Sequence, residues 1–232
     1  MIKKVYIWND ISLLRKDANN IRIKEILKEI KQTLNNQIDI LDDVEQKYKD
    51  KINGLKNIVT IGTRPNMFLN KTKKKYNIVS KRIIGKEGFA DDCILNVDEK
   101  IYRLKNINIV EDIIVSGTTM TKILEDLYKN NSNMKINVYF LIGYESAIED
   151  LKEKFPNLNV YCFNVLEEKS VKESTCMFLS DILYEKLGNK TYISHIQNLN
   201  LFGEKTEYFI SKMKEIKEEA KLKLVLLQLQ LE

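Results

Sequence analysis

The chain has 232 residues, of which 44% are hydrophobic and 31% are charged, a balance typical of folded soluble domains rather than disordered chains. The net charge of +5 is mild and is compatible with an anionic small ligand as readily as with nucleic acid, although we do not expect a nucleic-acid partner. The three cysteines form no CxxC pair or cysteine–histidine cluster, which argues against zinc and a disulfide framework. With neither a signal peptide nor a membrane-length apolar run in view, we expect a cytoplasmic protein without a membrane partner.

The first segment, residues 1–56, is predicted to be a helical segment packed on the core that follows. A short apolar stretch at Val5–Trp8 precedes a helix whose apolar residues recur at the spacing of one helical face. These residues are Ile23, Ile26, Leu27, Ile30 and Leu34. A second helix is predicted near 42–52, ending at Gly54, because glycine commonly follows a helix C-terminus.

From Asn57 the pattern changes to strands that alternate with helices, which predicts an α/β core over residues 57–165. The predicted strands are 57–62, 77–84, 107–112, 136–143 and 159–165. The first predicted helix follows Thr63-Arg64-Pro65 and reaches about Lys75, and two more run over 118–129 and 146–155. A polar loop is predicted at 85–92 and a hairpin arm at 93–102. Alternation with short connections favours a mostly parallel sheet, whose ligand sites lie at the carboxyl ends of the strands.

The third segment, residues 166–232, is predicted to be mainly helical. The apolar residues of 174–187 have helical spacing, and 204–221 reads as a charged helix. Residues 222–232 alternate like a strand but continue that helix, so the sequence leaves both structures open for them.

One stretch, residues 110–120 (VEDIIVSGTTM), carries the residue types of a sugar-phosphate site. Glu111 and Asp112 lie in an apolar strand, and Ser116 and Gly117 follow at the predicted start of a helix, where backbone N–H groups and a partial positive charge suit a phosphate. Two carboxylates would repel a phosphate alone, but they suit ribose hydroxyls or a magnesium ion that bridges ribose and pyrophosphate. The alternative is an ordinary strand that ends in acids before a Ser/Thr-capped helix.

This stretch resembles the signature of the type I phosphoribosyltransferases, in which an apolar run, two acids and three further residues precede Ser/Thr-Gly-x-Thr. The resemblance implies an α/β, Rossmann-like fold with a mostly parallel sheet, here with helical N- and C-terminal additions. It also implies that Glu111 and Asp112 are catalytic residues that hold the ribose hydroxyls, with Asp112 as a ligand of Mg2+. The residues implied to wrap the 5′-phosphate are Val115, Ser116, Gly117, Thr118 and Thr119.

Val115 departs from the hypoxanthine-guanine branch of that family. The branch has an aspartate at this place, which takes or holds the proton of the base, whereas valine cannot do proton chemistry. The departure argues against a 6-oxopurine acceptor and leaves the wider resemblance intact.

A second stretch, Gly62-Thr63-Arg64-Pro65, directly follows the first sheet strand, where type I enzymes place their pyrophosphate-binding loop. The resemblance implies that Gly62, Thr63 and Arg64 bind pyrophosphate, with the guanidinium as a two-pronged donor. The alternative is a strand-to-helix turn with Pro65 at the first helical position, a common use of proline.

A third stretch resembles the second strand and the mobile catalytic loop of orotate phosphoribosyltransferases. It consists of Lys81-Arg82 followed by Gly85-Lys86-Glu87-Gly88. The resemblance implies that Lys81 and Arg82 meet pyrophosphate and that Lys86 is catalytic, in a loop that closes over the site to exclude water. A solvated basic strand end followed by a plain loop is the alternative.

The resemblance implies transfer of a phosphoribosyl group from magnesium-bound phosphoribosyl pyrophosphate to a nitrogenous base, with release of pyrophosphate. Two alternatives remain open. One is a non-catalytic regulator of the same fold that binds phosphoribosyl pyrophosphate or a nucleotide, and the other is an interaction protein whose helical ends pair with a partner. The sequence does not identify the acceptor base, and it is compatible with a homodimer.

Overall fold

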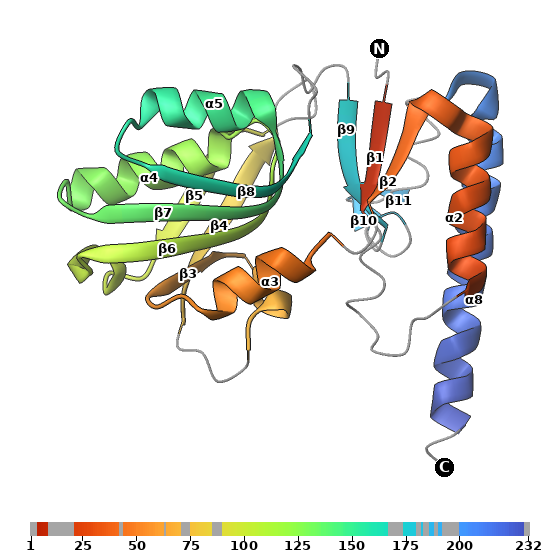
Figure 1. Ribbon diagram of the computed structural model, residues 1–232, viewed down its shortest axis with the longest axis horizontal. Coiled ribbons are helices and arrows are strands. Elements are labelled where there is room, and N and C mark those ends of the chain that lie inside the picture. The colour runs from red at the N-terminus through yellow and green to blue at the C-terminus, as the bar shows by residue number, and fades with distance from the viewer. Residues whose placement is uncertain are drawn as a thin grey trace. The chain divides into compact units, whose positions relative to one another are not determined.

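A computed structural model shows that the chain forms two compact units (Figure 1). Unit 1 comprises Met1–Asp43 and Lys172–Glu232, and unit 2 comprises Val44–Val171. These boundaries differ from the predicted ones, because the helix expected near 42–52 belongs to the α/β unit and the two ends of the chain share the other unit. The structure describes residues 4–8, 21–41, 44–62, 64–70, 75–84, 90–166, 174–179, 182, 186–187, 190–191 and 200–229.

Unit 1 contains a three-stranded parallel sheet and two long helices, α2 (Ile21–Leu34) and α8 (Thr206–Leu229) (Figure 1). The central strand of the sheet pairs in parallel with both of its neighbours. The strands, in spatial order, are β2 (Ile38–Leu41), β1 (Lys4–Trp8) and β9 (Ser174–Phe178). Shorter elements of this unit are η1 (Asn35–Gln37), β10 (Lys186–Leu187), β11 (Lys190–Thr191) and η4 (Gly203–Lys205).

The C-terminal part of unit 1 corrects one prediction and settles another. The helix predicted over 174–187 is wrong for its first part, because Ser174–Phe178 pairs with β1 as strand β9. The charged helix predicted over 204–221 is present as α8 and continues to Leu229, so the described part of 222–232 is helical. Within the described residues, no helix is both long and apolar enough to cross a membrane.

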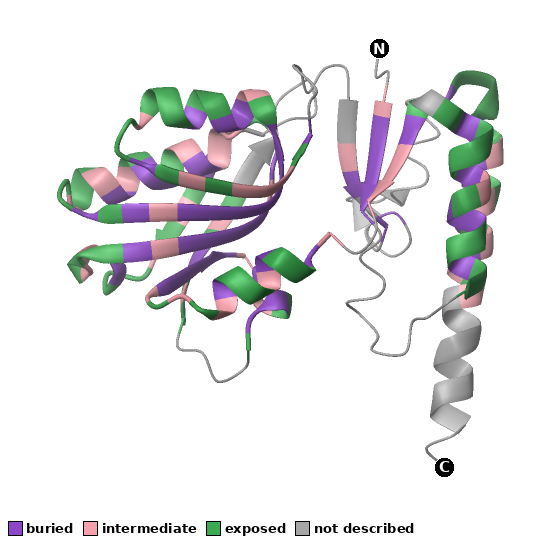
Figure 2. Cartoon of the chain, viewed as in Figure 1, coloured by how far each residue is buried: buried purple, intermediate pink, exposed green. Residues whose placement is uncertain are grey.

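The predicted apolar face of α2 is confirmed, since all five of its residues are buried (Figure 2). They pack in one cluster with β1 and with Phe209, Met213 and Ile216 of α8, which are spaced by four and three residues and so share one helical face. Burial of this shared apolar surface is the main source of stability for the unit.

Unit 2 is a six-stranded sheet with helices on both faces (Figure 1). The order is β5-β4-β3-β6-β7-β8, with β5 antiparallel to β4 and the other neighbours parallel, which confirms the predicted α/β class. The strands are β3 (Ile58–Ile61), β4 (Lys75–Ile84), β5 (Ala90–Val97), β6 (Asn106–Ile114), β7 (Lys135–Tyr144) and β8 (Asn159–Leu166). The helices are α4 (Thr118–Asn130) and α5 (Glu145–Lys154) on one face and α3 (Gln46–Asn53) on the other, with η2 (Arg64–Phe68) and η3 (Ile101–Arg103) between strands.

The connection after β3 differs from its prediction. In place of a helix to about Lys75 there is the short 3-10 helix η2, and β4 already begins at Lys75. Asn53 of α3 holds the end of η2, because its side chain donates to the carbonyl of Phe68 and accepts from the N–H of Asn70, both at 2.8 Å. A further α-helical turn would have to break both of these hydrogen bonds.

The loop predicted at 85–92 is also shorter than expected. Ala90–Val97 forms strand β5, which pairs with β4 as the second arm of a hairpin, and residues 85–89 lie outside the described part of the chain. The hairpin arm predicted at 93–102 therefore begins three residues earlier and ends at Val97.

The chain reverses its direction of travel across the sheet between β3 and β6. From β3 it proceeds to β4 and β5 on one side, and then it crosses to β6, β7 and β8 on the other side. At such a reversal the connections that leave two neighbouring parallel strands run apart, and a crevice opens at the carboxyl ends. The predicted pyrophosphate loop, residues 62–64, follows β3, and the predicted 5′-phosphate loop, residues 115–119, follows β6.

At the opposite, amino ends of the strands, an asparagine ladder crosses the sheet. Asn108, Asn137 and Asn159 occupy matching register positions on β6, β7 and β8. Asn159 donates to the side-chain oxygen of Asn137 at 2.8 Å, Asn137 donates to that of Asn108 at 2.9 Å, and Asn108 donates to the carbonyl of Lys56 at 2.6 Å. We call these three residues the asparagine ladder, and their amide chain fixes the register of the parallel strands.

Candidate functional site

The predicted acid pair lies near the carboxyl end of β6. Glu111 and Asp112 are only 7% and 6% exposed. The N–H of Asp112 donates to Glu111 Oε1 at 3.0 Å, and the N–H of Ile113 donates to Asp112 Oδ1 at 2.8 Å, so each carboxylate is held by the backbone of the next residue. Burying carboxylates is costly unless they gain such partners, and these contacts leave further oxygen lone pairs for a ligand.

Arg64 connects the loop after β3 to this acid pair. Its guanidinium Nη1 lies 3.6 Å from Asp112 Oδ2, with the arginine side chain 29% exposed and the carboxylate 9% exposed. Gly62 precedes it with a φ of 68°, a left-handed conformation that glycine adopts without strain, and its N–H donates to the carbonyl of Ile78 at 3.1 Å. The glycine therefore turns the chain sharply at the end of β3, and the arginine reaches the neighbouring strand.

The loop between β6 and α4 contains the residues predicted to bind a 5′-phosphate. Gly117 is the N-cap residue of α4 and has a φ of 74°. A Cβ added there would meet no atom closer than 3.7 Å, so the backbone angle, rather than lack of space, calls for glycine. Ser116 and Thr118 are bonded to each other through their hydroxyls at 3.1 Å, and Val115, Thr118 and Thr119 are half-buried.

The N-cap residue of α4 is a glycine, so it has no side chain with which to cap the start of the helix. The N–H groups of the first turn of a helix have no partners within the helix, and here they follow a left-handed glycine in the loop after β6. This geometry suits an anion, because the N–H groups and the helix dipole act together.

Tyr48 of α3 is part of the site and was not predicted to be. Its hydroxyl donates to the carbonyl oxygen of Glu111 at 2.8 Å. Its ring is fully buried and packs edge-on against Phe68 and Phe163 at 5.4 and 5.5 Å. Burial, and then the nearby charges of Glu111 and Asp112, raise the pKa of Tyr48 well above its usual value. The hydroxyl is therefore a permanent donor that fixes the backbone of the acid pair.

The other predicted pyrophosphate contacts are not brought together by the described residues. Lys81 is exposed on β4, opposite Ile94 of β5, and within the described ranges no hydrogen bond or ion pair joins it to Arg64. Arg82 follows on the same strand, but its side chain is outside the described part. Thr63 and Lys86 lie outside it entirely.

The two carboxylates are compatible with magnesium. In the part of the chain that the structure describes, no three His, Cys, Asp or Glu side chains gather closely enough to hold a metal ion unaided. Magnesium commonly binds through one or two carboxylates together with substrate phosphates and water, and Glu111 and Asp112 can supply that share.

Comparison with family models finds a match over most of the chain. A family model described as PRTase-CE matches residues 20–222. The sequence has no match among curated proteins. The family agrees with the resemblance of residues 110–120 to the type I phosphoribosyltransferases.

Several solved structures have a similar fold. The AQ2163 protein from Aquifex aeolicus is 19% identical, with a TM-score of 0.35 over 49% of this chain and 58% of that chain. A hypothetical protein from Neisseria gonorrhoeae with bound ppGpp is 15% identical, with a TM-score of 0.46 over 84% and 99%. Orotate phosphoribosyltransferase from Aeropyrum pernix is 15% identical, with a TM-score of 0.36 over 64% and 78%. The chain spans less than two thirds of the Aquifex protein, and similarities at these levels concern the fold alone.

Proposed function

The chain belongs to the PRTase-CE family, and on that premise we propose that unit 2 binds phosphoribosyl pyrophosphate with Mg2+ and transfers its phosphoribosyl group to a nitrogenous base. One observation carries the proposal: Arg64, from the loop after β3, pairs with Asp112 of β6 at the point where the sheet reverses. A cation from the loop after β3 and a carboxylate of β6 thus lie side by side, as a ligand with both a pyrophosphate and a ribose would require.

Each part of the ligand has a matching group. The N–H groups at the start of α4 and the left-handed Gly117 would take the 5′-phosphate. Glu111 and Asp112 would accept the ribose hydroxyls, and Arg64 would turn from Asp112 toward the pyrophosphate. Lys81, Arg82, Thr63 and Lys86 are proposed to complete the pyrophosphate side.

In the transfer, a nitrogen of the base attacks C1 of the ribose, and the bond from C1 to the pyrophosphate oxygen breaks. Pyrophosphate leaves with the electron pair, and the proton of the base nitrogen passes to the leaving pyrophosphate or to water. Bound Mg2+ would supply charge neutralisation at the pyrophosphate and help to orient it. The residues of the site hold the two reactants in line and stabilise the positive charge that develops at C1, which both carboxylates favour.

Val115 favours a second candidate function within the same fold. It is a half-buried apolar residue in the loop before α4 and cannot take a proton from a base. A regulator that binds phosphoribosyl pyrophosphate or a nucleotide without turnover needs no such proton acceptor. If the protein is an enzyme, hypoxanthine and guanine are expected to be poor acceptors for the same reason.

Calorimetric titration of the full chain with phosphoribosyl pyrophosphate and magnesium tests the binding step. Replacing Glu111 and Asp112 with alanine should weaken that binding by about 100-fold, because hydrogen bonds to charged groups contribute roughly 1.5–3 kcal/mol each. Inorganic phosphate binding should persist, since the N–H groups of α4 remain.

The chain offers a matched control in Glu149-Asp150, an exposed pair of the same residue types on α5. Alanine at both of these positions should leave the affinity unchanged. Equal affinity in the Glu111→Ala/Asp112→Ala variant and the control would contradict the assigned role of the acid pair.

Release of pyrophosphate with a broad panel of bases then separates the enzyme from the regulator. Steady release that is lost in Arg64→Ala and Lys86→Ala supports transfer. Tight, magnesium-dependent binding without release from any base supports the regulator.

A further inference from the structure

Unit 1 has a hollow of about 300 Å³ on its surface, between α2 and the sheet strand β2. It is lined by Lys24, Leu27, Lys28, Lys31 and Ile40, which we call the lysine hollow. Leu27 is buried and Ile40 is half-buried, whereas the three lysines are exposed. The hollow therefore has an apolar floor and a rim of ammonium groups.

The rim lysines follow one face of α2. Residues 24, 28 and 31 are separated by four and then three positions, the spacing at which helix side chains are neighbours. Like charges at this spacing repel one another, so the stripe gains nothing from its own arrangement. Of the three lysines, Lys31 is also stabilised by its position in the last turn of α2, where a cation interacts favourably with the helix dipole.

Among the acidic residues of unit 1 that the structure describes, only Asp39 pairs with this stripe, at its Lys31 end. Asp39 of β2 lies 2.6 Å from Lys31, and it is shared with Lys4 at 3.7 Å. Among the described residues, no acidic side chain pairs with Lys24 or Lys28. A carboxylate already sits against one rim lysine, and two further ammonium groups remain for an external anion.

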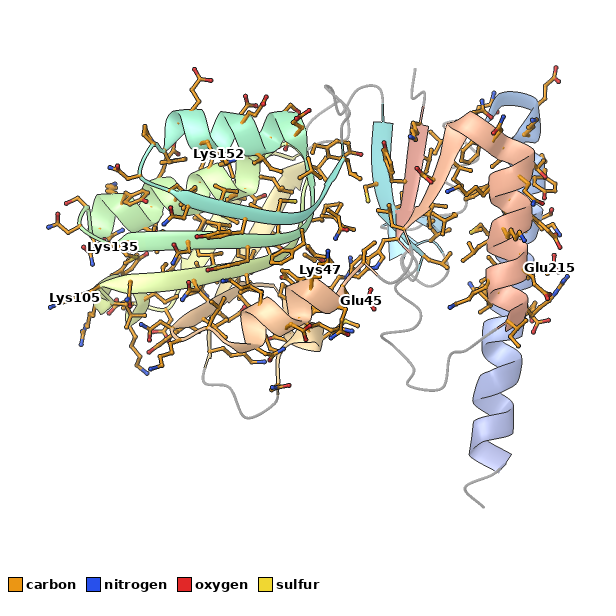
Figure 3. All side chains as sticks on the ribbon, viewed as in Figure 1. Glu45, Lys47, Lys105, Lys135, Lys152 and Glu215 are labelled. Atoms are coloured by element: carbon orange, nitrogen blue, oxygen red, sulfur yellow. The ribbon has the colours of Figure 1, made fainter. Side chains whose placement is uncertain are left out.

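The acids of α2 itself are engaged on the other side, toward α8. Glu29 lies 2.6 Å from Lys212, and Glu25 and Glu29 both lie within 4 Å of Arg22. Arg22 is in turn paired with Glu215 of α8, one of the side chains labelled in Figure 3. On α2, the acidic residues therefore lie on the side that contacts α8, and the lysines lie around the hollow.

We infer that the lysine hollow binds a small phosphorylated organic molecule, with its anionic group between Lys24 and Lys28 and its apolar part on Leu27 and Ile40. The volume lies at the lower end of the range for small-molecule sites, and an apolar floor with a few charged groups is their usual composition. This site belongs to unit 1 and is additional to the phosphoribosyl site proposed for unit 2.

Titration of the isotope-labelled full chain with phenyl phosphate, followed by amide chemical shifts, tests the inference. Phenyl phosphate joins an apolar ring to an anion, inorganic phosphate lacks the ring, and phenol lacks the charge. We expect phenyl phosphate to shift the amides of residues 24–31 and of Ile40, with inorganic phosphate and phenol each binding at least about tenfold more weakly. Shifts at residues 115–119 would report the unit 2 site separately, so the two proposals can fail independently.

The variant Lys24→Gln/Lys28→Gln keeps good helix formers and removes the two charges. It should weaken phenyl phosphate binding at the hollow by about tenfold or more. The control Lys105→Gln/Lys135→Gln makes the same charge change at two exposed lysines of unit 2 (Figure 3) and should alter the affinity by less than about twofold. If phenyl phosphate leaves the amides of 24–31 unmoved, binds the glutamine variant equally well, or binds no better than phenol or inorganic phosphate, the inference is wrong.

Discussion

The two ends of the unit 2 sheet are built from the same strands but from different chemistry. At the amino ends, Asn108, Asn137 and Asn159 stand in register and give each other their hydrogen bonds. At the carboxyl ends, the same sheet presents two buried carboxylates, an arginine from the neighbouring loop and glycines with left-handed backbones.

If the proposed function holds, the two ends of the sheet serve stability and binding separately. The neutral asparagine amides pair their donors and acceptors with one another and so fix the register of the strands. They leave little hydrogen-bonding capacity for a ligand. Charged groups whose ion pair is partly exposed, as in the pair Arg64–Asp112, can exchange that contact for a ligand. Changes at the amino end should therefore affect unfolding alone, and changes at the carboxyl end should affect binding as well.

The largest effect is expected for Gly143→Ala, at the carboxyl end of β7. A Cβ at this position would lie 2.6 Å from Ile114 Cγ2 and 3.0 Å from Cys162 Sγ, and both side chains would have to move. Overpacking of this kind costs roughly 1–3 kcal/mol of unfolding free energy. Because Ile114 directly precedes the phosphate loop, the affinity for phosphoribosyl pyrophosphate should fall too.

Denaturant unfolding and calorimetry measure these two losses. The control is Gly54→Ala, where an added Cβ would meet only the carbonyl of Lys51 at 3.4 Å. A folded Gly143→Ala protein with unchanged stability and unchanged affinity would show that this end of the sheet adapts freely.

On the same strand, Asn137→Ala should cost about 1–2 kcal/mol of unfolding free energy. It removes two hydrogen bonds of the asparagine ladder and leaves Asn108 and Asn159 each short of a partner. Asn133→Ala, at an exposed position in the turn before β7, is the matched control. Ligand affinity should be the same in both variants, and a loss of affinity in Asn137→Ala would break the separation between the two ends.

Arg64→Ala should show the reverse behaviour. The ion pair with Asp112 is partly exposed, so its loss should change the unfolding free energy by less than about 1 kcal/mol. The affinity for phosphoribosyl pyrophosphate should fall at least about tenfold, as expected when a charged donor to phosphate is removed. Arg103→Ala, at an exposed arginine of η3, controls for the charge, and equal affinities in the two variants would remove Arg64 from the site.

The smallest effect concerns pH and Tyr102 of η3. Burial, followed by a hydrogen bond of 2.6 Å to Asp126, raises the pKa of Tyr102 from 10.0 to about 12. The neutral form is thus favoured in the folded state, so this contribution to stability is complete below pH 10 and is lost as the pH rises toward 12. Unfolding of the protein and of Tyr102→Phe at pH 9 and at pH 11 measures it. The stability difference between them should shrink at the higher pH, while a constant difference would contradict the assignment.

The sequence by itself determined the periodic elements and the position of the loop between β6 and α4. The face of α2 from Ile23 to Leu34, the strands β3, β6, β7 and β8, and the start of α4 all follow from local patterns. Apolar periodicity and the placement of glycine depend on residues that are close in the sequence. These segments therefore adopt the secondary structure that their local sequence favours.

Only the tertiary structure decided which distant residues meet. Tyr48 lies 63 residues before Glu111 and reaches its carbonyl because α3 packs under the sheet, and nothing in the local sequence marks that hydroxyl. Likewise, Ser174–Phe178 has helical spacing but becomes strand β9, because β1 offers it an unpaired edge and backbone hydrogen bonds outweigh a weak local preference. The union of the two chain ends in unit 1 rests on the same cause, since the apolar faces of α2 and α8 can be buried only against each other and the sheet.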